Sequence, residues 1–395
     1  MSLFVSDARV VFGDGRPAEP HVHVRIRAGK IAAMSAELRP EANEPVLRAD
    51  GRVLMPGFVD AHTHALWAGD RWADFEASLQ GKSYAEIARA GGGIMSTVRA
   101  VRAASEHQLV DHLQHRLGAM LREGTTTLEV KSGYGLDAEN ELKMLRAIDT
   151  AARDFPGTIV KTALLGHAID PGVSDFVERT IDETLSRVHE EFPAVAIDAF
   201  CEASAWSVDD VRRLFERARQ LGHPLRLHVD QFTRLGGLSL ARELGIRSVD
   251  HLEATSVEEL EALAASETFG VMLPGTAFHL NTPYPKAGAF LRAGGRLVLA
   301  SNLNPGSAPG SSLPFTVALA VRHCGISVDE AIVAITSRAA ELLGFLDRGL
   351  VAPGQRADLV LLRHRDPRLL ALEFGGNPVD AVIVKGELVH GALSD

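Results

Sequence analysis

From about residue 80 to residue 345, helical stretches alternate with short apolar runs, and this rhythm constrains the fold more than any other feature of the sequence. EHQLVDHLQHRLGAMLREG, for example, has the spacing of a helix. Strands that alternate with helices are typical of βα units and a parallel sheet. The candidate strands are GFVDAHTH, TTLEV, TIVKTALLG, AIDAF, LRLHV, SVDHL, FGVMLP and RLVLAS. Because eight parallel strands can close a sheet on itself, the sequence predicts an α/β fold with a TIM-like (β/α)8 barrel.

The two ends of the chain have a different pattern, without helical stretches. HVHVRIRAGKIAAM near the start alternates apolar and polar residues around a Gly-Lys turn, and GQRADLVLLRHRD and VDAVIVKGELVH near the end are also strand-like. We therefore expect residues 1–57 and 350–395 to pair into one small β-sandwich domain. Residues 58–349 are expected to form the barrel domain.

Composition excludes several classes of function. The formal net charge is −10 and no basic stripe is visible, which argues against a nucleic-acid partner. No apolar run reaches the roughly 18 residues of a membrane span. The two cysteines, Cys201 and Cys324, are too few for a disulfide framework, and the chain begins without a signal-peptide pattern. These features predict a cytoplasmic protein with no nucleic-acid or membrane partner.

Polar groups follow several of the predicted strands. His62 and His64 are two positions apart in DAHTH, so both side chains lie on one face of an extended segment. An HxH pair alone is also compatible with two surface histidines. However, His228 and His251 end two later runs, and SNLNPGS follows another. Because active sites of such barrels lie at the carboxyl ends of the strands, the pattern predicts a site for zinc, iron or another divalent metal.

Longer motifs resemble a known family. PGFVDAHTH resembles the opening motif of the amidohydrolase superfamily, and GQRADLVLL resembles its closing segment. AGDRWADFEASLQGKSYAEIARAGGGIMSTVRA, LEVKSGYGLDAENELKMLR, HVDQFTRLGG, SVDHLE and SNLNPGSAPGSSLP resemble the imidazolonepropionases, and the resemblance runs from about residue 50 to 365. It implies hydrolysis of the cyclic amide 4-imidazolone-5-propanoate to N-formimino-L-glutamate by a metal-bound water, in histidine degradation. It also implies a homodimer.

The resemblance assigns roles to individual residues. It implies that one divalent metal ion, zinc or iron, is held by His62, His64, His228 and the residue at position 302. His251 matches a catalytic histidine that orients water or polarises the carbonyl. The positions that match substrate-binding residues are Arg71, Tyr84, Tyr134 and His167. A glycine triplet, Gly91–Gly93, lacks the patterns of a phosphate-binding loop and is interpreted as a flexible loop near the substrate.

Asn302 departs from the family pattern. The family has Asp there, in T-D-L-N-P-G, where this chain has SNLNPG. An amide can offer an oxygen to a metal but carries no charge and cannot act as a base, and loss of a general base typically lowers the rate by about 10²–10⁴. The substitution is either engineered, compensated by another base, or a sign that hydrolysis is lost. Asp230 is the preferred replacement base, with Glu253 as the second choice.

Two other functions therefore stay open. One is a related amidohydrolase that acts on another cyclic amide or an amidine. The other is a catalytically impaired relative that binds a ligand or metal without turnover, which Asn302 alone favours. The choice between zinc and iron is open as well, because three nitrogens and an amide oxygen suit both.

Overall fold

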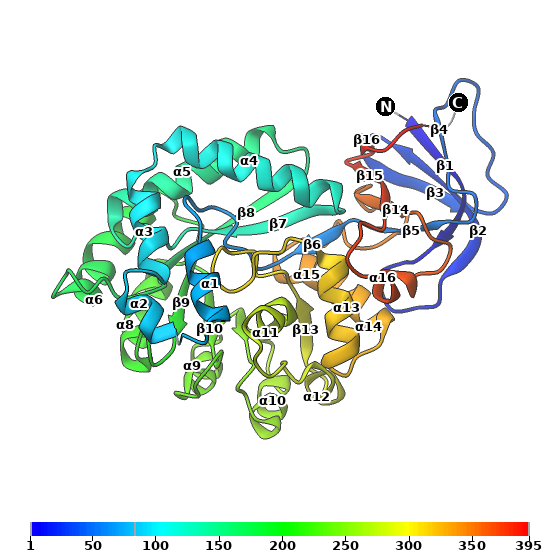
Figure 1. Cartoon of the computed structure of the whole chain (residues 1–395). Coiled ribbons are helices and arrows are strands. Elements are labelled where there is room, and N and C mark those ends of the chain that lie inside the picture. The colour runs from blue at the N-terminus through cyan, green and yellow to red at the C-terminus, as the bar shows by residue number, and fades with distance from the viewer. Residues whose placement is uncertain (1, 83, 394–395) are drawn as a thin grey trace.

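The structure is a computed structural model that describes residues 2–82 and 84–393. Parallel strands form the sheet at its centre (Figure 1). Their order is β13-β12-β11-β10-β9-β8-β7-β6, so each strand pairs with its neighbour in the sequence. The strands are β6 (Phe58–Asp60), β7 (Thr125–Lys131), β8 (Thr158–Gly166), β9 (Ala196–Cys201), β10 (Leu225–Val229), β11 (Ser248–His251), β12 (Phe269–Met272) and β13 (Arg296–Leu299). All eight predicted barrel strands are confirmed.

The ring closes just beyond the first and last strands. The backbone N–H of Asn302 donates to the carbonyl of His62 at 3.1 Å, and that of His64 donates to Leu303 at 2.9 Å. These bonds join the segments that follow β6 and β13. We call this junction the seam. The seam completes a nearly closed (β/α)8 barrel, as predicted.

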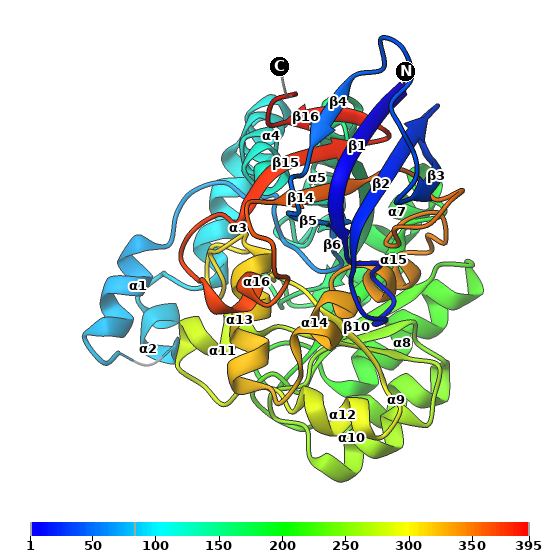
Figure 2. The ribbon, with the colours of Figure 1, turned by 90° about the vertical axis from the view of Figure 1, so that its right-hand side faces the viewer.

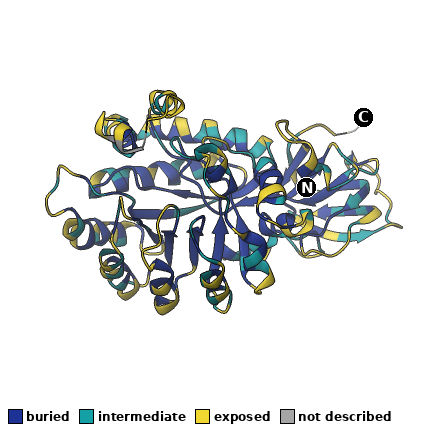
Figure 3. Cartoon of the chain, turned by 60° about the horizontal axis from the view of Figure 1, so that its bottom comes forward, coloured by how far each residue is buried: buried dark blue, intermediate teal, exposed yellow. Residues whose placement is uncertain are grey.

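Helices surround the barrel and bury their inner faces against it (Figure 3). In α4, the apolar residues Leu109, Leu113 and Leu117 recur every four positions and are buried, and Ser105 caps the helix start. The helices between β6 and β9 are α1 (Trp72–Leu79), α2 (Tyr84–Arg89), α3 (Ile94–Ala103), α4 (Glu106–Arg122), α5 (Ala138–Asp154), α6 (Phe176–Arg179), the π-helix η1 (Thr180–Thr184) and α7 (Leu185–Glu191). After β9 come α8 (Val208–Gln220), α9 (Gly237–Leu244), α10 (Val257–Ala264), α11 (Pro274–Leu280), α12 (Ala287–Arg292), α13 (Leu313–His323), α14 (Val328–Ala334), α15 (Ser337–Leu342) and α16 (Leu369–Leu372).

The two chain ends build a second sheet beside the barrel, and both termini lie there (Figures 1 and 2). Its order is β16-β15-β14-β5-β1-β2-β3, with β4 also paired to β1. The strands are β1 (Ser2–Val10), β2 (Glu19–Arg27), β3 (Lys30–Ser35), β4 (Val46–Arg48), β5 (Val53–Pro56), β14 (Leu359–Leu362), β15 (Val379–Val384) and β16 (Glu387–His390). The predicted β unit from both chain ends is confirmed, and its strands form one continuous mixed sheet.

Apolar side chains from both ends share one core in this sheet. Val5, Val24 and Ile31 from the start of the chain pack in the same buried cluster as Leu359 and Ile383 from the end. The sheet therefore folds around its own core, as the layers of a sandwich do. The division of the chain at residues 57/58 and 349/350 stays a prediction.

The helix α1 differs from those that pack on the barrel. None of its residues is buried, and Trp72, Phe75 and Leu79 are exposed on it. It protrudes with α2 near α11 (Figure 2), and the ring of Phe75 stacks on that of His279 at 5.6 Å. Within residues 2–82 and 84–393, no helix combines the length and the apolar character that crossing a membrane requires.

Candidate active site

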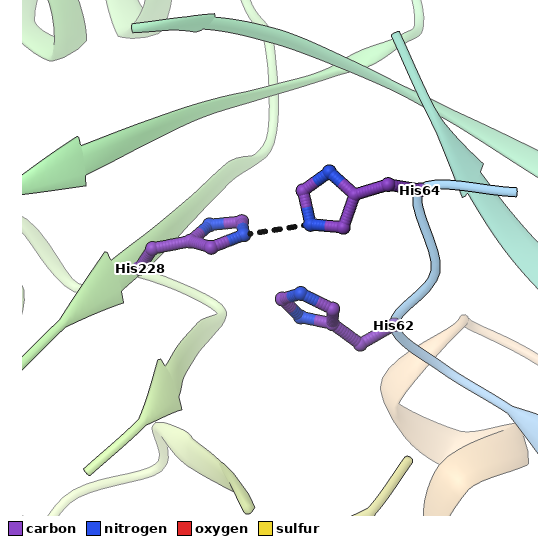
Figure 4. A group of neighbouring side chains, drawn as sticks. All are labelled: His62, His64 and His228. Carbon is purple, nitrogen blue, oxygen red and sulfur yellow. Dashed lines mark hydrogen bonds between the residues drawn. The ribbon is translucent and has the colours of Figure 1, made fainter. Parts of the chain in front are cut away.

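Three histidines converge at the carboxyl end of the barrel strands (Figure 4). His62 and His64 come from the segment after β6, and His228 comes from β10. Each offers one nitrogen, and these atoms all lie within 4.8 Å of one another. Nε2 of His64 and Nε2 of His228 are 3.3 Å apart. Two nitrogens bound tetrahedrally to zinc would be separated by about 3.3 Å, so this spacing fits a metal ion.

The hydrogen bonds behind these histidines fix where their protons lie. Nδ1 of His62 is 2.6 Å from Asp250, and Nδ1 of His228 is 3.1 Å from Asp198. Because a carboxylate only accepts, Nδ1 carries the proton in both rings and each Nε2 has a free lone pair. Nε2 of His62 is buried without a partner in the part of the chain that the structure describes. Such a buried acceptor with a free lone pair is suited to binding a metal ion.

Burial keeps the three rings neutral. It lowers the pKa of His62 and of His64 well below the ordinary value, and positive charge nearby lowers both further. Burial also lowers the pKa of His228, although the Asp198 carboxylate opposes this effect. Metal ligation requires neutral imidazole, so these directions suit binding of a cation.

A buried layer of charges lies behind the histidines. Nζ of Lys131 is 2.6 Å from Glu129 and 2.8 Å from Asp198. The Arg226 guanidinium donates to Glu129 and to Asp250, at 2.9 Å each. Three carboxylates therefore face two cations, and two of the carboxylates orient metal-site histidines. Sequence reasoning missed this layer, although charged residues inside the apolar runs LEVK, IDAF, LRLHV and SVDH were a usable signal.

Asn302 is buried at the seam beside the histidines. Its Nδ2 donates to Oγ1 of Thr276 at 2.8 Å, whereas its Oδ1 has no partner among the described residues. Its φ is +55°, a left-handed conformation that asparagine tolerates better than most residues. The free amide oxygen can accept a hydrogen bond or complete the coordination of a cation, but it cannot take up a proton.

His251 lies next to the ligand group. The centre of its ring is 5.5 Å from that of His228 and 5.9 Å from that of His62. Its Nδ1 is 3.3 Å from the carboxylate of Glu253. His251 has a φ of +91° and Leu252 a φ of +70°, an unusual backbone that turns the chain sharply at the end of β11.

The two proposed replacement bases do not join the ligand group. Glu253 contacts His251, so it reaches the site only through that histidine. The Asp230 carboxylate accepts from Oγ1 of Thr255 at 2.9 Å. Strand alternation would place Asp230 on the same face as His228, two positions earlier. A φ of +55° at Asp230 ends that alternation. Burial raises the pKa of Asp230 to about 6, and negative charge nearby adds to the rise.

Two predicted substrate residues are brought against the ligand group. The His167 ring stacks on that of His64, with centres 5.1 Å apart, and the Tyr134 ring is 5.0 Å from that of His167. Nδ1 of His167 donates to the carbonyl of Gly133 at 2.9 Å, which leaves Nε2 as an acceptor. Burial lowers the pKa of His167 to about 3, so this ring is neutral at physiological pH.

Tyr134 and Gly133 belong to a loop that a buried acid holds in place. The Glu141 carboxylate accepts from the backbone N–H groups of Gly133 at 2.9 Å, Gly135 at 2.7 Å and Leu136 at 2.9 Å. Sequence reasoning did not identify Glu141 as important. It fixes both the loop that carries Tyr134 and the carbonyl that orients His167.

Arg71 lies on another side of the candidate active site. Its guanidinium packs against Gly306, where a Cβ would be only 3.2 Å from Nη1. Gly306 belongs to a turn in which the Asn304 side chain donates to the carbonyl of Asn302 at 2.7 Å. The turn therefore connects Arg71 with Asn302. The side chain of Tyr84, the fourth predicted substrate residue, lies outside the described residues.

Comparisons with known proteins agree with this architecture. The sequence model of the amidohydrolase family matches residues 53–389. The chain is 44% identical to an imidazolonepropionase of Herpetosiphon aurantiacus over 93% of this chain and 90% of that protein. It is 44% identical to one of Deinococcus radiodurans over 91% and 90%, and 40% identical to one of Paracoccus denitrificans over 92% and 93%.

Solved structures share the fold at low sequence identity. A triazine hydrolase variant has a TM-score of 0.75 at 17% identity and covers 99% of this chain and 95% of its own. A zinc complex of atrazine chlorohydrolase from Arthrobacter aurescens has a TM-score of 0.73 at 16% identity, with 98% and 95% covered. These matches show the barrel and its accompanying sheet. The family model and the relatives above show that the chain belongs to the amidohydrolase family and, within it, to the imidazolonepropionases.

Proposed function

We propose that this protein hydrolyses 4-imidazolone-5-propanoate to N-formimino-L-glutamate. In this reaction the ring amide C–N bond breaks. The oxygen of water forms the new carboxylate, one of its protons goes to the ring nitrogen that leaves, and the other is released. The observation that carries the proposal is the group of three neutral histidines, His62, His64 and His228, in a chain whose relatives are named imidazolonepropionases.

Side chains around the three histidines support substrate binding. Arg71 is a partly buried cation that can pair with the propanoate carboxylate. The free Nε2 of His167 can accept a hydrogen bond from a ring N–H, and Tyr134 lies beside it. Tyr84 is proposed as a further substrate contact from the family resemblance alone.

The chemistry needs a cation and a proton acceptor. A divalent cation held by the three histidines polarises the ring carbonyl and lowers the pKa of water. Asn302 can orient that water through Oδ1 but cannot deprotonate it. We assign proton transfer to His251, because Glu253 accepts from its Nδ1 and leaves Nε2 available. The replacement base would then be His251 supported by Glu253, with no role for Asp230.

Several finer properties are also part of the proposal. The cation is zinc or iron, since imidazole and amide ligands suit both. The compartment is the cytoplasm, which two free, buried cysteines support. A homodimer is proposed from the family resemblance, and sedimentation of the metal-loaded protein would test it.

The direct experiment follows the ultraviolet absorbance of 4-imidazolone-5-propanoate with zinc- or iron-loaded protein. Loss of absorbance should accompany formation of a product one water heavier, identified by mass spectrometry. His251→Ala should abolish the reaction while metal content is retained. If neither the natural chain nor Asn302→Asp consumes the substrate, the proposed activity is wrong.

A second function rests on one observation. Asn302 stands where the family pattern has an acid, which favours a protein that binds the substrate with little or no turnover. Calorimetry separates the two functions. The alternative requires that 4-imidazolone-5-propanoate binds and that no product is found in the calorimeter cell after the titration.

A further inference from the structure

Two residues of the glycine triplet Gly91–Gly93 contact the side chain of Asp74. The backbone N–H of Gly93 donates to Oδ2 of Asp74 at 2.9 Å. A Cβ at Gly92 would lie 2.2 Å from Oδ1 of Asp74, a distance that no real contact allows. Gly91 and Gly93 have φ values of +89° and +69°, which side chains rarely adopt. Gly92 and Gly93 therefore fit closely around one carboxylate.

The same carboxylate holds Arg71. Oδ2 of Asp74 accepts from Nε of Arg71, in a pair whose side chains are 17% and 10% exposed. With Nε engaged, the two Nη nitrogens face the turn at Gly306, and Nη1 is 3.5 Å from Oγ1 of Thr97. These two nitrogens form an edge through which a guanidinium group can pair with a carboxylate by two hydrogen bonds.

Arg71 immediately precedes α1, and α1 has no buried residue. The link from Arg71 through Asp74 to Gly93 is a polar connection between the start of α1 and the start of α3, beside the contact of Arg71 with Thr97. We call Asp74, Gly92 and Gly93 the Asp74 clamp.

We propose that the Asp74 clamp is a positioning device for Arg71 and sets the selectivity of the site for ligands that carry a carboxylate. The inference rests on the proposed function, because it takes Arg71 as the partner of the propanoate group. Asp74 itself does not touch the substrate. It acts by fixing the plane and direction of the guanidinium, and the glycines allow the carboxylate to come close enough to do so.

The test compares two probes that share the imidazole ring and its two-carbon chain, 3-(imidazol-4-yl)propanoate, which ends in a carboxylate, and 4-propylimidazole, which ends in a methyl group. Calorimetry on the zinc-loaded protein gives the ratio of their affinities, and any contact of the imidazole ring with the metal cancels in that ratio. Gly92→Ala displaces the Asp74 carboxylate but keeps its charge. It should lower the preference for the carboxylate probe about tenfold, the loss of one charge-assisted hydrogen bond. Gly310→Ala is the matched control, because a Cβ there meets nothing within 4 Å, and its ratio should be unchanged.

Asp74→Asn separates positioning from simple electrostatics. Removing a negative charge beside Arg71 would by itself strengthen binding of an anion, whereas loss of positioning weakens it. We expect a fall in the ratio similar to that of Gly92→Ala, and no further fall when Asp74→Asn is added to Arg71→Met. A higher ratio in Asp74→Asn, or an unchanged ratio in Gly92→Ala with normal melting, overturns the inference. An unchanged ratio in Arg71→Met instead overturns the role of Arg71 in the proposed function.

Discussion

The backbone N–H of Asn302 donates to the carbonyl oxygen of His62 at 3.1 Å, so the residue that departs from the family pattern is bonded directly to a metal-site histidine. Its side chain is buried, and Oδ1 has no partner within the described residues. The amide therefore presents a free oxygen beside the candidate metal site, but it supplies neither a negative charge nor a proton acceptor.

Restoring the acid should raise activity. We expect Asn302→Asp to increase kcat/KM by about 10²–10⁴, because the carboxylate adds a base beside the metal site. The loss of substrate absorbance measures this increase. Asn281→Asp, at an exposed helix end, controls for the added charge and should have no effect. Equal rates for the natural chain and Asn302→Asp would contradict the role of this position.

Glu253 and Asp230 should differ in their effect on turnover. Glu253→Gln weakens the acceptor behind Nδ1 of His251, so kcat should fall at least about tenfold. Asp230→Asn should leave kcat within about twofold, because its carboxylate bonds to Thr255. Steady-state kinetics with both variants decides between them. If Asp230→Asn lowered kcat more than Glu253→Gln did, Asp230 would be the base instead.

The buried charges should govern metal affinity. Asp198→Asn weakens the acceptor for Nδ1 of His228, and loss of such a partner typically lowers metal affinity about 10–100-fold. Titration of zinc against a chelator of known affinity measures the change. Asp149→Asn, which removes a partly exposed partner of Lys161, is the control. An unchanged zinc affinity in Asp198→Asn would mean that the histidine is oriented without its carboxylate.

The small sheet should lose stability in acid through Glu44. Burial raises the pKa of this carboxyl, but hydrogen bonds from Arg25 and Ser2 outweigh it and lower the pKa to about 2. The ordinary value is about 4.3, so Glu44 stabilises the fold above that pH and the contribution is lost as the pH falls toward 2.

Glu44→Gln should therefore lower the free energy of unfolding at pH 7 by on the order of 2 kcal/mol and make its decline between pH 4.5 and 2 (about the range of the two pKa values) less steep. Urea unfolding at several pH values measures both effects. Glu41→Gln, at a more exposed partner of Arg25, should change little. Parallel pH curves for the natural chain and Glu44→Gln would contradict the assignment.

The barrel was predictable because its strands are short apolar runs at regular intervals, and His62, His64 and His228 were predictable because each follows such a run. The Asp74 clamp was not, because the bond from Asp74 to Gly93 spans nineteen positions and depends on backbone angles. The side-chain direction of Asp230 could not be predicted for a similar reason, since strand alternation does not apply to a residue with a left-handed backbone. Local periodicity predicts elements, whereas contacts between loops depend on the assembled fold.

At the seam, backbone hydrogen bonds join two chain segments that are separated by more than two hundred residues in the sequence. The same place lies beside the candidate metal site. A cation bound by His62, His64 and His228 would link the segment after β6, which forms one side of the seam, to β10 on another part of the barrel. Binding of metal would therefore raise both the catalytic ability of the protein and the resistance of its barrel to opening.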